Sequence, residues 1–189
     1  MHTEYEAKFL NVDKDSVRQR LLASGATLVK PDFLQKRHVF QLPAEKHSPH
    51  AFARVREESG VVTLTWKKFT GADADHPQEI ELIVDDFDNA VEFVKELGCI
   101  PKSFQESYRE LWRLGEAKIT IDTWPFMEPF VEIESTTEEA VKRASIGAGF
   151  EWSAALFCSV TKLFKMKYGG HVNIRDMPRL TFDMPNPFV

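Results

Sequence analysis

Charged and apolar residues alternate along several short segments of this chain, and that pattern is typical of β-strands with two different faces. In residues 4–10, charged Glu4, Glu6 and Lys8 alternate with apolar side chains. Further strands are predicted at residues 33–42, 52–58, 61–69, 78–84, 104–114, 117–122 and 130–134. The turn at Ser59-Gly60 predicts that the second and third of these strands form a hairpin.

Helical spacing of apolar residues separates these strands and follows the last of them. Helices are predicted at residues 15–24, 86–97, 136–144 and 153–168. A strand, a helix and a second strand occur twice in similar order without a linker between the copies, which predicts one fold built from two similar halves. We expect one domain over residues 1–170 and a proline-containing tail, residues 171–189, packed on that domain without regular structure.

Composition excludes several classes of protein. The 189 residues include 24 Lys and Arg against 29 Asp and Glu, a net charge of -5, which argues against nonspecific binding of nucleic acid. Two cysteines cannot build a disulfide framework. We found no signal-peptide pattern and no apolar stretch approaching the roughly 20 residues of a membrane span, so a cytoplasmic protein without a membrane partner is expected.

The charged positions of the strands fall in pairs of one sign. Residues i and i+2 of a strand share a face, so Arg54 lies beside Arg56, Glu79 beside Glu81, and Glu132 beside Glu134. The simplest interpretation is a set of solvated outer faces. Like charges that are neighbours repel, however, and a cupped sheet would surround one cavity with acidic and basic sets. Such a cavity suits a polyanion together with a divalent metal.

One of these segments also contains a pattern that resembles the sequence signature of a known family. Glu4-Tyr5-Glu6-Ala7-Lys8 has the Glu-x-Glu-x-Lys signature of the CYTH superfamily, the triphosphate tunnel metalloenzymes. That family includes class IV adenylyl cyclases, thiamine triphosphatases and inorganic tripolyphosphatases. The resemblance covers residues 1–169 and continues in order through Arg54-Val55-Arg56, Leu64-Thr65-Trp66-Lys67, Glu79-Ile80-Glu81, Arg109 with Trp112, Asp122, and Phe130-Val131-Glu132-Ile133-Glu134.

The resemblance implies an α+β fold, an antiparallel eight-stranded β-barrel that forms a tunnel and has flanking helices. It implies that Mg²⁺ or Mn²⁺ is held by four carboxylates, Glu4, Glu6, Glu132 and Glu134. The triphosphate would contact Lys8, Arg54, Arg56, Lys67 and Arg109. Glu79, Glu81 and Lys67 form the expected catalytic group, with the two glutamates near the metal or the attacking water. Asp122 would orient an arginine, and Lys162 or Lys165 would reach inward from the last helix.

The chain departs from the family pattern in two places. Ser107 stands where the family often has a lysine, and residues 36–40 lack the acidic residue that some cyclases have there. We expect an enzyme that hydrolyses a small-molecule triphosphate: tripolyphosphate, thiamine triphosphate or a nucleoside triphosphate. The alternatives are an adenylyl cyclase that converts ATP to cyclic AMP and pyrophosphate, and a noncatalytic module that binds polyphosphate or nucleotide. A homodimer is one assembly that the sequence leaves open.

Overall fold

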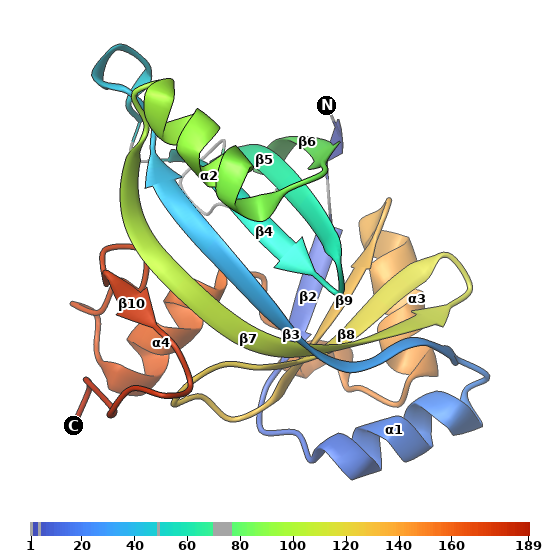
Figure 1. The fold of residues 1–189 in the computed structure, drawn as a ribbon. Helices are drawn as coiled ribbons and strands as arrows, with labels where there is room; N and C mark the ends of the chain where they lie inside the picture. The colour runs from blue at the N-terminus through green and yellow to red at the C-terminus, as the bar shows by residue number, and fades with distance from the viewer. Residues whose placement is uncertain (1, 4, 49, 70–76) are drawn as a thin grey trace.

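The computed structural model describes residues 2–3, 5–48, 50–69 and 77–189, which form one curled sheet with helices around it (Figure 1). The strands are β1 (His2–Thr3), β2 (Tyr5–Phe9), β3 (Thr27–Gln41), β4 (Ala51–Glu58), β5 (Val61–Phe69), β6 (Pro77–Val84), β7 (Ile100–Leu114), β8 (Ala117–Thr123), β9 (Phe130–Ser135) and β10 (Arg179–Leu180). The α-helices are α1 (Lys14–Ala23), α2 (Phe87–Glu96), α3 (Glu138–Gly147) and α4 (Val160–Tyr168), and short 3₁₀ turns occur at Ala44–Lys46 and Trp152–Ala154. Within the described residues, none of the helices has the length and apolar character needed to cross a membrane.

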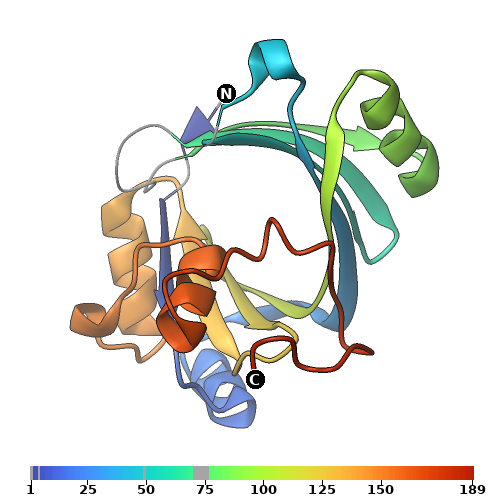
Figure 2. The ribbon, with the colours of Figure 1, turned by 90° about the vertical axis from the view of Figure 1, so that its left-hand side faces the viewer.

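The strand order explains why the sheet curls. Neighbouring strands are antiparallel in the order β1-β6-β5-β4-β3-β7-β8-β9-β2, and β10 pairs in parallel with β7. The N-terminal segment therefore contacts both ends of this order, with β1 beside β6 and β2 beside β9. Figure 2 shows the resulting half-barrel from one open end. The predicted antiparallel fold of eight main strands with flanking helices is confirmed.

The apolar face of the sheet points outward, toward the helices. Ala7, Ile119 and Ile133 belong to a buried cluster shared with Val17 of α1 and Val141 of α3. A second cluster joins β3, β4 and β5 to α2. Because the helices cover the apolar face, the alternating charged residues of the same strands are turned toward the inside of the curl. The interpretation of these faces as solvated outer surfaces is therefore wrong.

Local signals that the sequence contains set many of the boundaries. Asp13, Asp86 and Thr137 each accept a hydrogen bond from a backbone N–H in the first turn of a helix, as N-caps do. Ser59 and Gly60 both have positive φ, 53° and 81°, which matches the tight turn predicted for the β4–β5 hairpin.

The last helix begins later than predicted. The backbone of Leu156 pairs with Lys8 of β2 through two hydrogen bonds of 2.9 Å, which holds this segment extended. Ser159 then caps α4 through its hydroxyl. The prediction of one helix over residues 153–168 is therefore wrong before Val160, because pairing with β2 takes precedence over local helical spacing. Phe157 in this extended segment is 44% exposed.

The C-terminal tail follows α4 and lies against the barrel. Val172, Ile174 and Leu180 are buried in a cluster with Leu163 and Phe164 of α4. Arg179–Leu180 forms β10 on β7, so the expectation of a tail without regular structure is wrong at this strand. The tail thereby covers part of one end of the half-barrel (Figure 2).

Candidate functional site

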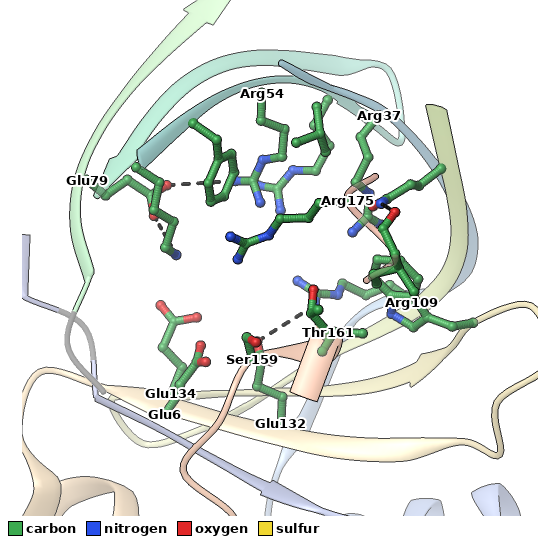
Figure 3. Close-up of a pocket in the computed structure, with 18 of the residues that line it drawn as sticks. Glu6, Arg37, Arg54, Glu79, Arg109, Glu132, Glu134, Ser159, Thr161 and Arg175 are labelled. Atoms are coloured by element: carbon green, nitrogen blue, oxygen red, sulfur yellow. Dashed lines mark hydrogen bonds and ion pairs between the residues drawn. The ribbon is translucent and has the colours of Figure 1, made fainter. Parts of the chain in front are cut away.

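The inner face of the sheet encloses a cavity of about 210 Å³ (Figure 3). Among the described residues, eight cationic side chains and five carboxylates line it. The cations are Lys8, Arg37, Arg54, Arg56, Lys67, Arg109, Lys118 and Arg175, and the carboxylates are Glu6, Glu79, Glu81, Glu132 and Glu134. The cavity therefore has an excess of positive charge although the whole chain is acidic.

One side of the cavity is acidic. Glu6 of β2 lies directly opposite Glu134 of β9 in the sheet register, and Glu132 shares the same face of β9. Figure 3 shows the three carboxylates on the side of the cavity that faces Arg37 and Arg54. Like charges in directly opposed positions repel. Each of these two carboxylates has a lysine partner, Lys8 at 2.6 Å from Glu6 and Lys118 at 3.1 Å from Glu134.

Lys8 lies within this acidic side and is almost completely buried, with 1% of its side chain exposed. Its ammonium Nζ is 2.6 Å from Glu6 Oε1 and 3.0 Å from Glu132 Oε2. Burial lowers the pKa of Lys8, but Glu132 and Glu6 outweigh burial and raise that pKa above its usual value. Burial likewise opposes ionisation of Glu132, whereas Lys8 and Arg109 hold the pKa of this carboxyl below its usual value.

The opposite side is basic and consists of Arg37 of β3 with Arg54 and Arg56 of β4. Arg37 lies directly opposite Arg56, a second pair of like charges in register. Burial, followed by the charge of Arg56, lowers the pKa of Arg54 to about 10. Burial and the neighbouring arginines lower the pKa of Arg37 as well. In the described part of the chain, the buried Nε atoms of all three have no hydrogen-bond acceptor, although Nη2 of Arg56 lies 3.5 Å from both Glu58 and Glu81.

Glu79 and Glu81 of β6 adjoin the basic side. Lys67 Nζ of β5 is 2.8 Å from Glu79 Oε2, and its strand neighbour Thr65 donates a 3.0 Å hydrogen bond to Glu81 Oε2. Arg54 reaches both carboxylates at longer range, 3.8 and 3.7 Å. Burial favours the neutral form of Glu79, but Lys67 and Arg54 outweigh it and lower the pKa of this carboxyl.

Arg109 of β7 is held in a fixed orientation. Its Nε and Nη2 donate hydrogen bonds of 2.6 and 2.7 Å to the two oxygens of Asp122 on β8, and Thr120 donates a third to the same carboxylate. Asp122 is 1% exposed and does not line the cavity, whereas Arg109 does. This two-point contact restrains the guanidinium, whose Nη2 also lies 3.8 Å from Glu132 Oε1.

The structure thus brings most of the predicted site residues to one cavity. Glu4 lies outside the described residues. Lys162 and Lys165 of α4 do not line the cavity, because α4 meets it through its first turn, at Ser159 and Thr161. The described part of the chain contains no group of three or more histidine, cysteine, aspartate or glutamate side chains that lie close enough together to hold a metal ion as they stand.

Sequence reasoning missed Arg37, Lys118 and Arg175. Arg37 Nη2 donates hydrogen bonds to Gln35 and to Ser107, so its charge lies beside the position where the family often has a lysine. The internal repeat contained a signal for Arg37, because it aligns with Arg109. Arg175 comes from the irregular tail, where no periodic pattern indicates which side chains point inward.

Comparisons with known proteins agree with this geometry. Residues 2–156 match the family model for the CYTH domain, and no curated protein matches the chain. A Vibrio parahaemolyticus structure provisionally assigned as an adenylate cyclase has a TM-score of 0.73 and 15% identity, covering 87% of this chain and 98% of that one. The PH1012 protein from Pyrococcus horikoshii has a TM-score of 0.67 and 21% identity, covering 82% and 96%.

A third similar structure is HpAC1 from Hippeastrum, provisionally assigned as an adenylyl cyclase and described as having a dominant triphosphatase activity. Its TM-score is 0.55 and its identity is 16%, covering 89% of this chain and 96% of that one. At such identities these likenesses show the fold alone. The family match spans most of the chain, and the half-barrel with its charged interior is the fold that the match implies. This chain therefore belongs to the CYTH domain family.

Proposed function

We propose that this protein hydrolyses a small-molecule triphosphate with the help of a divalent metal ion. The observation that carries the proposal is the cavity itself, in which three arginines on β3 and β4 face three carboxylates on β2 and β9. Each side contains a pair of like charges in direct register. A ligand that is both anionic and metal-bound would relieve the repulsion on both sides at once.

The basic residues are suited to bind the phosphate chain. Guanidinium groups bind phosphate oxygens as bidentate forks, and an excess of buried positive charge makes an anionic ligand favourable. One side of the cavity provides three such groups, from Arg37, Arg54 and Arg56. Arg109 provides a fourth, which Asp122 orients through hydrogen bonds. Arg37 also supplies a cation beside Ser107, which compensates for the lysine that the family often has there.

The acidic side is suited to a hard divalent cation, Mg²⁺ or Mn²⁺. Carboxylate oxygens are the ligands that such ions prefer, and Glu6 with Glu134 would hold the ion, with Glu132 beside them. Glu4 is the fourth ligand that the family resemblance implies. When bound, the ion neutralises charge on phosphate oxygens and makes the phosphorus more open to attack. Lys8 pairs with both Glu6 and Glu132 and so restrains these two carboxylates.

The remaining acidic residues are suited to the water molecule. Glu81 is 37% exposed and Glu79 is 11% exposed, so Glu81 is the better placed of the two to accept a hydrogen bond from an attacking water. The water oxygen attacks the terminal phosphorus in line, and its proton passes to the carboxylate. The bond from that phosphorus to its bridging oxygen breaks, and Lys67 and the arginines stabilise the negative charge that develops there.

The test is turnover by the purified protein with Mg²⁺ or Mn²⁺ on tripolyphosphate, thiamine triphosphate and ATP. Phosphate release that requires the metal and disappears in Glu134→Gln supports the proposal. The matched control is Glu138→Gln, on the exposed first turn of α3, which should keep full activity. The triphosphatase activity described for the Hippeastrum protein is consistent with this outcome.

Two other results would replace the proposal. Cyclic AMP and pyrophosphate formed from ATP would identify a cyclase, in which the ribose 3′-hydroxyl attacks the α-phosphorus and pyrophosphate leaves. Tight binding of a triphosphate, measured by calorimetry, with no product of either kind would identify a binding module.

A further inference from the structure

The C-terminal tail contributes directly to the cavity. The family match ends at residue 156, yet Ile174 and Arg175 of the tail line the cavity together with Ser159 and Thr161 at the start of α4. Figure 2 shows this tail crossing the open end of the half-barrel. This part of the site therefore belongs to a segment outside the matched CYTH region.

Specific contacts to β7 fix the tail in place. The carbonyl of Ile174 accepts a hydrogen bond of 3.1 Å from Ser103 Oγ and another of 2.9 Å from Gln105 Nε2, and both donors are buried. Farther along, Phe104 N–H donates to the carbonyl of Pro178 at 3.0 Å where β10 begins. These bonds hold the backbone directly before Arg175 and again three residues after it, which restricts where its side chain enters the cavity.

Arg175 covers an aromatic surface of the cavity. Its guanidinium carbon lies 4.6 Å from the centroid of the Phe52 ring, in a cation–π arrangement. Figure 3 shows Arg175 between the basic and acidic sides of the cavity. Val39, Phe52 and Ile174 are apolar lining residues, and Phe52 offers the ring face on which an organic ring could stack.

A second cavity lies behind this pair. It has a volume of about 260 Å³, and Val39, Phe52 and Arg175 line both cavities. Its other lining residues include His47, Lys102 and Asn173, so it is polar and without the dense charge of the first. The Phe52–Arg175 pair therefore stands between the charged cavity and a space that could accept an organic group.

We propose that Arg175 is a specificity-determining residue that selects an unsubstituted phosphate chain over a triphosphate ester. Its guanidinium binds one end of the chain, and by covering Phe52 it closes the way to the second cavity. An ester such as ATP would have to displace Arg175 from the ring to place its base there. This inference rests on the proposed binding of triphosphates in the first cavity.

The experiment compares tripolyphosphate with ATP in the wild type, Arg175→Ala and Arg175→Met. Both kcat/KM and the calorimetric Kd are measured for each ligand, because binding tests the selectivity even in a protein without turnover. The preference for tripolyphosphate over ATP is expected to fall about tenfold or more in both variants, since both lose a charge-assisted contact to the phosphate chain, and Arg175→Ala also uncovers the Phe52 ring. Arg175→Lys should keep part of the preference.

Arg179→Ala is the matched control on the same tail. The Arg179 guanidinium pairs with exposed Asp183 at 2.7 Å and does not line either cavity, so its loss should leave the preference unchanged. Urea unfolding of each variant confirms that the barrel is intact. A preference that stays within about twofold of wild type in folded Arg175→Met would overturn the proposal. An equal fall in Arg179→Ala would also overturn it, because the tail as a whole and not Arg175 would then set selectivity.

Discussion

Replacing Lys8 with methionine removes the cation that holds the acidic side of the cavity together. The Lys8 ammonium lies 2.6 Å from Glu6 and 3.0 Å from Glu132, and only 1% of its side chain is exposed. Methionine has a similar length and leaves two carboxylates on one inner face without this partner. The Glu132 side chain is 12% exposed, so water can screen it only weakly.

The loss of one partner from a buried ion pair costs about 3–5 kcal/mol. Arg109 remains 3.8 Å from Glu132, which favours the lower end, about 3 kcal/mol. For a chain of this size, that loss lowers the melting temperature by about 6–12 °C, at roughly 2–4 °C per kcal/mol.

The cost should depend on pH, with a sign that follows from Glu132. Lys8 and Arg109 outweigh burial and hold the pKa of Glu132 below its usual value in the folded protein. Its contribution to stability is therefore present above the unfolded pKa, about 4.3, and is lost as the pH falls through the folded value. In Lys8→Met, Glu132 loses the cation that most favours its charged form, so burial of the charge is costly until this carboxyl is protonated. The difference between wild type and variant should be largest near neutral pH and should shrink as the pH falls to about 4.

Urea unfolding at pH 7 and pH 4 measures this effect. The double variant Lys8→Met/Glu132→Gln should recover part of the lost unfolding free energy at pH 7, because it removes one of the two carboxylates that Lys8 pairs with. Lys14→Met is the matched control, since Lys14 forms a 2.9 Å pair with Asp32 that is more exposed. That control should cost no more than about 1 kcal/mol. A cost below about 1 kcal/mol for Lys8→Met at pH 7, or a cost that grows at pH 4, would refute the reasoning.

Three further predictions concern other residues. Glu134→Gln should lower metal-dependent phosphate release on the order of 100-fold or more. The free energy of unfolding in urea should change by no more than about 1 kcal/mol, because the lysine partner of Glu134 is 34% exposed. A large loss of stability would instead indicate a structural role. Arg56→Ala should raise the KM for a triphosphate more than for a phosphate monoester, and equal changes in the two KM values would argue against a cradle for the phosphate chain. Glu110→Gln should lower the melting temperature, because this carboxylate is 3% exposed and accepts hydrogen bonds from Arg18 and Trp112. It should leave KM unchanged, because Glu110 does not line the cavity. A change in KM without a change in melting temperature would contradict a purely structural role for Glu110.

Local patterns in the chain were sufficient to find the eight main strands and most helix boundaries, although β3 and β7 begin earlier than predicted and β10 was missed. The alternation in residues 4–10 and the capping residues Asp13, Asp86 and Thr137 act over a few neighbouring positions, so they can be read without the fold. The ordered series of acidic and basic pairs likewise indicated the family, because its members keep the same order along the chain. The start of α4 could not be read in this way, since pairing of Leu156 with Lys8 joins segments far apart in sequence.

The direction in which each strand face points depended on the packing of distant segments. A period of two separates charged from apolar side chains in a strand, but it does not say which set faces the helices. Covering of the apolar face by α1, α2 and α3 settled that question and turned the charges inward. The same holds for Arg37, whose place beside Ser107 follows from the register of β3 on β7. It also holds for Arg175, which is positioned by the hydrogen bonds that β7 donates to the neighbouring Ile174 carbonyl. Contacts between residues 70 or so positions apart define this cavity, and no local pattern in the chain encodes them.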